Sequence, residues 1–499
     1  MIHAIVLRVY NEEECINWIT KKRGQVPYSS NVQGTHLSEH ILKSAKRASK
    51  TQSKPKKKAC RKLQKLDQSF KDVLLEIFQE YKNNITPKNC KKSGRAIDQR
   101  LAFDMPKELK NYNDLFLTRE INLSDEKFGK LSLINEAFQY CYLNQSEASS
   151  AFIDLINSDE GDYTRYLFFY FNNLIRNKDF ESAKQISKTI NVLESNLLIQ
   201  QSKKWLDESN YNKFSQIFSC ENEQDILAEF FFLISNFLAV DNNFKKSNFY
   251  SNISNYLNPK FYFNLTHLIS NYIENKNYKQ TKNLLENFNQ EDEIYYWYKL
   301  KKNAQIIDDE QGSKKSLFYI EKKFNDYSSP YKKIIYDMAN IYKRNKEFKK
   351  SIKYYSLLLN KLDKNTNAYA EVLYKRGSSY ERIGDNESSD KDLLQSLSIK
   401  PNDPYVLNYL GYGWLERGFK IQDAIIMLDK AYNQKKNDPF IIDSVGWGYY
   451  LIGDYDEAEK FLRKAIQLMP NDPIVNDHYG DILWKLNRKI QAKYYWKSA

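Results

Sequence analysis

The sequence predicts an all-α protein built as a solenoid of stacked helical hairpins, and three observations lead to this class. The triplet Asn-Asp-Pro occurs three times, ending at Pro404, Pro439 and Pro473, at intervals of 35 and 34 residues. A glycine follows each proline after seven residues, and alanines recur further on at the same interval. A fixed period of this length indicates one structural unit per copy, stacked on its neighbours.

Each Asn-Asp-Pro marks the start of a helix. The aspartate carboxylate accepts a hydrogen bond from a backbone N–H that the helix start leaves unpaired. Proline fits the first helical position because it lacks an N–H that would have no partner there. The three triplets therefore predict helices that begin at the three prolines.

Small residues predict where two helices of one hairpin touch. Glycine lies in the first helix, a residue that tolerates the left-handed conformation ends it, and alanines lie in the second helix. The first-helix glycines are Gly377, Gly411, Gly446 and Gly480; the turn residues are Gly418, Gly453 and Asn487; the second-helix alanines are Ala424, Ala431, Ala458, Ala465 and Ala492.

The same register continues upstream with a weaker motif. Steps of 34 to 38 residues back from Gly377 reach a series of small residues, and most have a serine twelve positions later. These pairs are Gly377 with Ser389, Ala339 with Ser351, Ala304 with Ser316, and Ser235 with Ser247; Ser270 has Lys282 instead. Four short polar turns precede Phe180, Phe244, Tyr278 and Phe348. We therefore expect divergent repeats over 130–365 and clear repeats over 366–499.

The clear copies resemble the tetratricopeptide repeat of bacterial proteins. The best copy runs from Asp443 to Ala458 and continues through Phe461, Leu462, Ala465 and Pro470. The resemblance implies a right-handed α-solenoid that acts as a non-enzymatic scaffold and binds a peptide or protein partner in its concave groove.

The resemblance also implies which residues face that groove. They lie three and six positions before, and one and four after, the small residue of each first helix. The groove residues expected here are Tyr405, Asn408, Tyr412 and Leu415; Phe440, Asp443, Trp447 and Tyr450; and Ile474, Asp477, Asp481 and Trp484. Aromatic rings with carboxylates suit a partner that carries apolar and basic side chains, rather than an acidic tail.

Positive charge is concentrated in the first hundred residues, which carry 22 lysines and arginines against 9 acidic residues. We divide this region into a short N-terminal segment (1–40), a basic linker (41–66) and a helical connector (67–129). The linker is interpreted as solvated, with a possible weak contact to anionic surfaces. Without interleaved aromatics it does not indicate specific nucleic-acid recognition.

Two motifs in the N-terminal segment raise the question of an enzyme active site. Residues 4–16 resemble the opening strand and Asn-Glu-Glu turn of nucleotide-sugar glycosyltransferases, so the alternative function is such an enzyme, or its remnant, with the repeats as a docking arm. The metal-binding aspartates of that family are missing, since residues 17–66 contain no aspartate. His36 and His40 fit H-x-x-E-H without an identifiable third ligand. We expect no enzyme activity, cofactor or metal.

Five cysteines lie far apart without a CxxC pair, which indicates reduced thiols rather than a disulfide framework or zinc site. No stretch approaches the length of a membrane span. These features favour a cytoplasmic protein, with a periplasmic or membrane-associated location if the true N-terminus differs.

Overall fold

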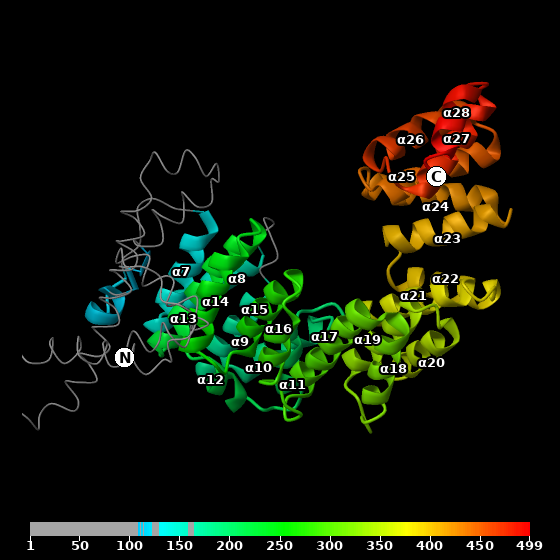
Figure 1. Ribbon diagram of the computed structural model, residues 1–499. Helices are drawn as coiled ribbons and strands as arrows, with labels where there is room; N and C mark the ends of the chain where they lie inside the picture. The colour runs from blue at the N-terminus through cyan, green and yellow to red at the C-terminus, as the bar shows by residue number, and fades with distance from the viewer. Residues whose placement is uncertain (1–107, 110, 113, 122–128, 158–163) are drawn as a thin grey trace, which may run out of the picture. The chain divides into compact units, whose positions relative to one another are not determined.

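The computed structural model describes residues 108–499 except 110, 113, 122–128 and 158–163 (Figure 1). Within these residues the chain forms helices and turns and no strand, which confirms the all-α class. The basic linker, the glycosyltransferase-like segment and the H-x-x-E-H motif lie outside the described residues.

The chain divides into two compact units, each described by itself. Unit 1 contains the described residues up to Ile190 together with Ser195–Lys299, and unit 2 contains Asn191–Glu194 and Leu300–Ala499. In chain order, the helices up to the unit boundary are α7 Gly129–Tyr142, α8 Glu147–Ile156, α9 Tyr166–Arg176, α10 Phe180–Thr189, α11 Leu197–Asp207, α12 Asn212–Ile217, α13 Glu223–Val240, α14 Phe244–Leu257, α15 Tyr262–Glu274, α16 Tyr278–Leu285 and α17 Glu293–Gln311, which crosses it.

The later helices form the repeats of unit 2. They are α18 Ser313–Phe324, α19 Lys332–Arg344, α20 Phe348–Leu359, α21 Asn367–Glu381, α22 Asn386–Ile399, α23 Pro404–Glu416, α24 Ile421–Gln434, α25 Pro439–Ile452, α26 Tyr455–Leu468, α27 Pro473–Lys485 and α28 Lys489–Trp496. Consecutive helices pack as hairpins, α21 on α22, α23 on α24, α25 on α26 and α27 on α28.

The turns inside the hairpins match the sequence signals. The four short polar turns place Lys178, Asn242, Lys276 and Lys346 at φ between 54° and 63°, each two residues before a helix begins. Gly418, Gly453 and Asn487 likewise have positive φ. A left-handed residue reverses the chain after the first helix, so the predicted hairpin turns are confirmed.

The small-residue register is confirmed by contacts across the hairpins. The Ser235 hydroxyl donates to the carbonyl of Ser247 at 2.8 Å, and the Ser316 hydroxyl donates to the carbonyl of Ala304 at 2.7 Å. A Cβ added at Gly377 would lie 3.3 Å from the carbonyl oxygen of Ser389. Each pair is twelve residues apart, as the divergent repeats predicted.

The three Asn-Asp-Pro sequences start helices as expected. Asp403, Asp438 and Asp472 each accept hydrogen bonds from two backbone N–H groups of the following turn, and proline occupies the first turn of α23, α25 and α27. These caps set where each first helix begins and therefore which of its residues face the second helix.

Unit 1 corrects the expectation of reduced thiols. Cys141 and Cys220 form a disulfide, and both are nearly fully buried among aromatic side chains. The sequence gave no sign of this pair because the two cysteines are 79 residues apart and come together only when α7 packs near the turn before α13. The other cysteines lie outside the described residues.

Candidate functional site

The expected groove residues lie on the first helices of the three clear hairpins, and we call this set the groove face. Tyr405, Phe440, Ile474, Asp477 and Trp484 are exposed; Asn408, Tyr412, Trp447, Tyr450 and Asp481 are partly buried; Asp443 and Leu415 are buried. Tyr405, Phe440 and Ile474 hold the same position in successive hairpins and are 49%, 60% and 61% exposed. One position of the repeat therefore carries a large, exposed apolar side chain in three successive hairpins.

The opposite side of each first helix packs against its own hairpin partner. A Cβ at Gly411 would lie 3.0 Å from the carbonyl oxygen of Ala424, and one at Gly446 would lie 2.7 Å from Leu462 Cγ. Only glycine permits such close packing, so the glycine side is fixed inward. The exposed residues of the groove face lie away from this packed side.

The expectation that Leu415 faces the groove is wrong. Its side chain is 4% exposed and packs in a cluster with Leu410 and Leu428. It also lies against Gly448 of the next hairpin, where an added Cβ would be 3.0 Å from Leu415 Cδ1. The missing side chain at Gly448 leaves space that Leu415 fills.

A polar and aromatic cluster joins three of these helices. His478 Nδ1 lies 2.9 Å from Asp443 Oδ2, and both side chains are 8% exposed. The Trp447 ring stacks on the His478 ring at 4.1 Å and on Tyr450 at 4.7 Å. The Trp447 indole N–H donates to Glu416 Oε1 at 2.6 Å. This cluster links α23, α25 and α27 on the groove face.

The local sequence around His478 gives no sign of the aspartate with which it pairs. Histidine and aspartate are 35 residues apart, one repeat length, so the pairing follows from the stacking of equivalent helices. The repeat register places His478 two residues before Gly480 and Asp443 three before Gly446. A comparison of adjacent positions in neighbouring repeats would therefore have been the signal.

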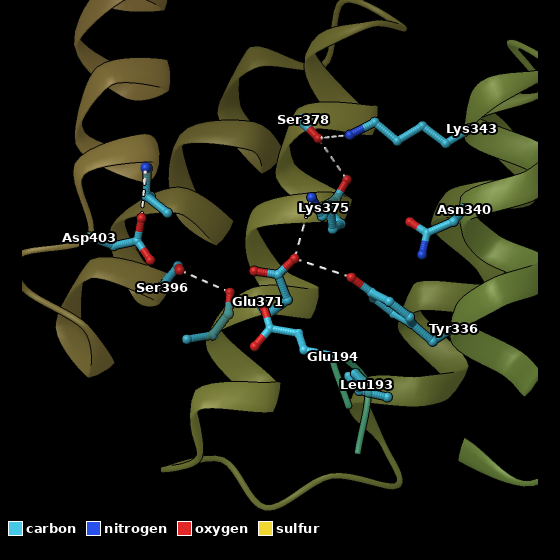
Figure 2. A network of polar contacts seen from close by, with 12 residues as sticks. Leu193, Glu194, Tyr336, Asn340, Lys343, Glu371, Lys375, Ser378, Ser396 and Asp403 are labelled. Carbon is cyan, nitrogen blue, oxygen red and sulfur yellow. Dashed lines mark hydrogen bonds and ion pairs between the residues drawn. The ribbon is translucent and has the colours of Figure 1, made fainter. Parts of the chain in front are cut away.

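Earlier in unit 2, side chains of the first helices α19 and α21 form a polar network (Figure 2). The Tyr336 hydroxyl donates to Glu371 Oε1 at 3.1 Å, and Lys375 pairs with the same carboxylate at 3.3 Å. Lys343 donates to the Ser378 hydroxyl. Burial, with Lys375 and Arg382 nearby, lowers the pKa of Lys343 to about 8.

The turn Asn191–Glu194, which belongs to the same unit, packs against this network. Val192 and Leu193 are buried in a hydrophobic cluster with Tyr336, Ala339 and Tyr369, and the Lys333 ammonium donates to the Leu193 carbonyl at 2.5 Å. Figure 2 shows Leu193 and Glu194 next to Glu371. Burial lowers the pKa of Lys333, and the negative charges of Asp337 and Glu194 oppose this shift.

The part of the chain that the structure describes contains no group of three or more histidine, cysteine, aspartate or glutamate residues placed to hold a metal ion. None of its helices is long and apolar enough to cross a membrane.

Comparisons with known proteins point to one family. Two models described as tetratricopeptide repeat match residues 370–403 and 442–472. Among solved structures, MamA from Desulfovibrio magneticus RS-1 is 17% identical, covers 33% of this chain and 91% of its own, and has a TM-score of 0.29. A tetratricopeptide repeat protein from Parabacteroides merdae is 17% identical over 40% of this chain and 77% of its own, with a TM-score of 0.32.

A third solved structure is PilW, described as a widely conserved type IV pilus biogenesis factor. It is 20% identical, covers 34% of this chain and 75% of its own, and has a TM-score of 0.31. The matched segments coincide with the hairpins α21–α22 and α25–α26. Residues 370–403 and 442–472 of this chain are thus tetratricopeptide repeats.

Proposed function

We propose that this protein is a scaffold whose groove face binds a segment of a partner protein. The proposal places the contact on α23, α25 and α27, where exposed Tyr405, Phe440 and Ile474 offer an apolar stripe. Aromatic residues dominate the energetics of protein interfaces because they bury a large area with few rotatable bonds. Trp447, Tyr450 and Trp484 add further rings to the same face.

The observation that carries the proposal is the turn Asn191–Glu194. It lies against Lys333 and Tyr336, which are six and three positions before Ala339 and thus correspond to Tyr405 and Asn408 in α23. The turn inserts two apolar side chains and presents one carbonyl to a lysine. Equivalent positions of this solenoid therefore already accept a short segment from outside the hairpins.

Site-specific photo-crosslinking tests the proposal. A photoreactive phenylalanine analogue is placed at Phe440, on the groove face, and at Ile426 of α24 as the control. The two side chains are 60% and 65% exposed, but Ile426 belongs to a second helix of a hairpin. We expect a discrete protein adduct from Phe440 in cells and none from Ile426. Equal adducts at both positions, or adducts only at Ile426, would move the contact off the groove face.

The disulfide carries an inference about location. Disulfides persist in oxidising compartments and are rare where thioredoxin and glutathione keep thiols reduced. The Cys141–Cys220 pair therefore supports a place of action outside the reducing cytoplasm. Acid quenching of cells followed by alkylation tests this: we expect the two cysteines to be oxidised at the moment of quenching, and free thiols there would support a reducing compartment.

A further inference from the structure

The groove-facing positions of unit 2 differ in charge along the array. α19 contributes Lys333 and Lys343, and the segment that lies there carries Glu194, whose charge acts on Lys333. The groove face of α23, α25 and α27 contains Asp443, Asp477 and Asp481 and no lysine or arginine. At Lys333, the charge of Glu194 in the bound segment is opposite to that of the lysine. The acidic part then calls for a basic occupant.

Asp443 supplies a specific unmet interaction. Its residue is 6% exposed, His478 contacts only Oδ2, and Oδ1 is buried without a hydrogen-bond partner in the described part of the chain. Asn408 Oδ1, at the equivalent position of α23, is also buried without a partner. A buried acceptor without a donor is costly, and the cost is greater for a carboxylate. Two such acceptors in adjacent repeats need donors.

The surrounding groups favour a cation. Burial raises the pKa of Tyr412, and the charges of Glu416 and Asp443 raise it further, which places both carboxylates near one neutral hydroxyl. Trp447 orients Glu416 through its indole N–H. Aromatic faces beside carboxylates attract positive charge through cation–π and Coulomb interactions together.

A cavity of about 400 Å³ is lined by Tyr412 and Glu416, together with Tyr409 and others. Two arginines also line it and are already paired: Arg417 with Asp390 at 2.7 Å, and Arg382 with Glu381 at 3.6 Å. The cavity provides room for a long side chain next to Glu416.

We propose that Asn408, Tyr412, Glu416, Asp443 and Trp447 form a pocket for an arginine side chain of the partner segment. Arginine fits better than lysine because its planar guanidinium carries five donors and stacks on aromatic rings, so it reaches several separate acceptors at once. This inference rests on the proposed function, since it names the chemistry that the groove face recognises.

Calorimetry with defined peptides tests the pocket on the full chain. The probes are blocked heptapeptides of alanine and phenylalanine with a central arginine, lysine or citrulline. Citrulline keeps the shape of arginine and removes its charge. We expect the arginine peptide to bind about tenfold or more tightly than the citrulline peptide, with lysine between them.

Variants assign the effect to the pocket. Glu416→Gln and Asp443→Asn should each reduce the preference for arginine over citrulline. Asp456→Asn on α26, an acidic position as exposed in class as Glu416, should leave the preference unchanged. Glu416 is at the exposed end of α23, so its substitution reports binding even if Asp443→Asn perturbs folding.

Three results would overturn the pocket: no binding of the arginine peptide, equal binding of arginine and citrulline peptides, or a preference that survives both substitutions. If Phe440 still forms its crosslink in that case, the scaffold function stands and only the arginine assignment fails. If the crosslink is also absent, the proposed function itself is wrong.

Discussion

Left-handed residues in the hairpin turns show how single positions control stability. Lys346 adopts φ 61°, a conformation that costs an L-residue about 1 kcal/mol and costs glycine almost nothing. Gly384, Gly418 and Gly453 occupy the corresponding turns in the clear repeats, so the upstream hairpins keep the geometry with less suitable residues. The four early hairpins with short polar turns thus differ from most of the clear ones in having no glycine at the left-handed turn position.

Lys346→Gly should raise the free energy of unfolding by up to about 1 kcal/mol, because the left-handed strain is removed. The matched control is Lys353→Gly, an exposed lysine in the middle of α20, which should lower stability by about 1 kcal/mol through loss of helix propensity. Chemical denaturation of unit 2 would measure both. The same sign for the two substitutions would contradict the turn assignment.

Lys343 makes unit 2 sensitive to alkaline pH. The pKa of Lys343 in the folded protein is about 8, below the ordinary value of 10.5. Below pH 8 the folded protein therefore contains a charged ammonium that burial and nearby cations disfavour. Between pH 8 and 10.5 the unfolded chain binds the extra proton, and stability rises with pH.

Relative to a Lys343→Met variant, the wild-type protein should therefore gain up to about 3 kcal/mol of unfolding free energy across this range. Denaturation at pH 7, 9 and 10.5 measures the difference, and Lys349→Met, an exposed position of α20, serves as control. A difference that is constant with pH would show that Lys343 keeps an ordinary pKa in the folded state.

At the scale of the element, glycines determine which side of a first helix packs closely against its partner helix. Gly446 touches Leu462 of its partner helix, while the space around a Cβ added at Gly413 is empty within 4 Å. Both glycines lie in first helices, so helix propensity alone predicts the same benefit from alanine at either place. Packing separates them.

Gly446→Ala should lower the free energy of unfolding by about 1–3 kcal/mol, because the new methyl group overpacks the contact with Leu462. Gly413→Ala should raise it by up to about 1 kcal/mol. Thermal melts of the two variants test the hairpin register, and equal effects would mean that the glycine side of α25 is not the close-packed side.

At the scale of the whole molecule, different interactions stabilise the fold of each unit. Unit 1 has a core rich in phenylalanine and one disulfide that closes a long stretch of chain. Unit 2 depends mainly on the repeated contacts within and between adjacent hairpins. Changes to the disulfide should therefore act on unit 1.

The Cys141→Ala, Cys220→Ala double variant should lose about 4 kcal/mol of unfolding free energy in unit 1, because the unfolded chain regains the freedom of a loop of about 80 residues. Hydrogen exchange locates the effect: protection should fall in α7 and α13 and remain in α25. Unchanged exchange in α7 would show that the cysteines contribute only packing.

Local signals in the sequence determined the hairpin class and the helix starts at Pro404, Pro439 and Pro473. Caps, turns and close-packing residues act within one repeat, so their physical effects can be recognised from residue types and spacing. Leu415 was misplaced because its environment depends on Gly448 in the next repeat.

Tertiary structure alone decided the Cys141–Cys220 disulfide, the Asp443–His478 pair with its unpartnered oxygen, and the placement of Asn191–Glu194 against α19. Each joins residues from one repeat length to 140 positions apart. No local propensity encodes such contacts, because they arise only when many hairpins have stacked and the chain has returned on itself. The candidate arginine pocket is of this kind, since its acceptors belong to neighbouring repeats.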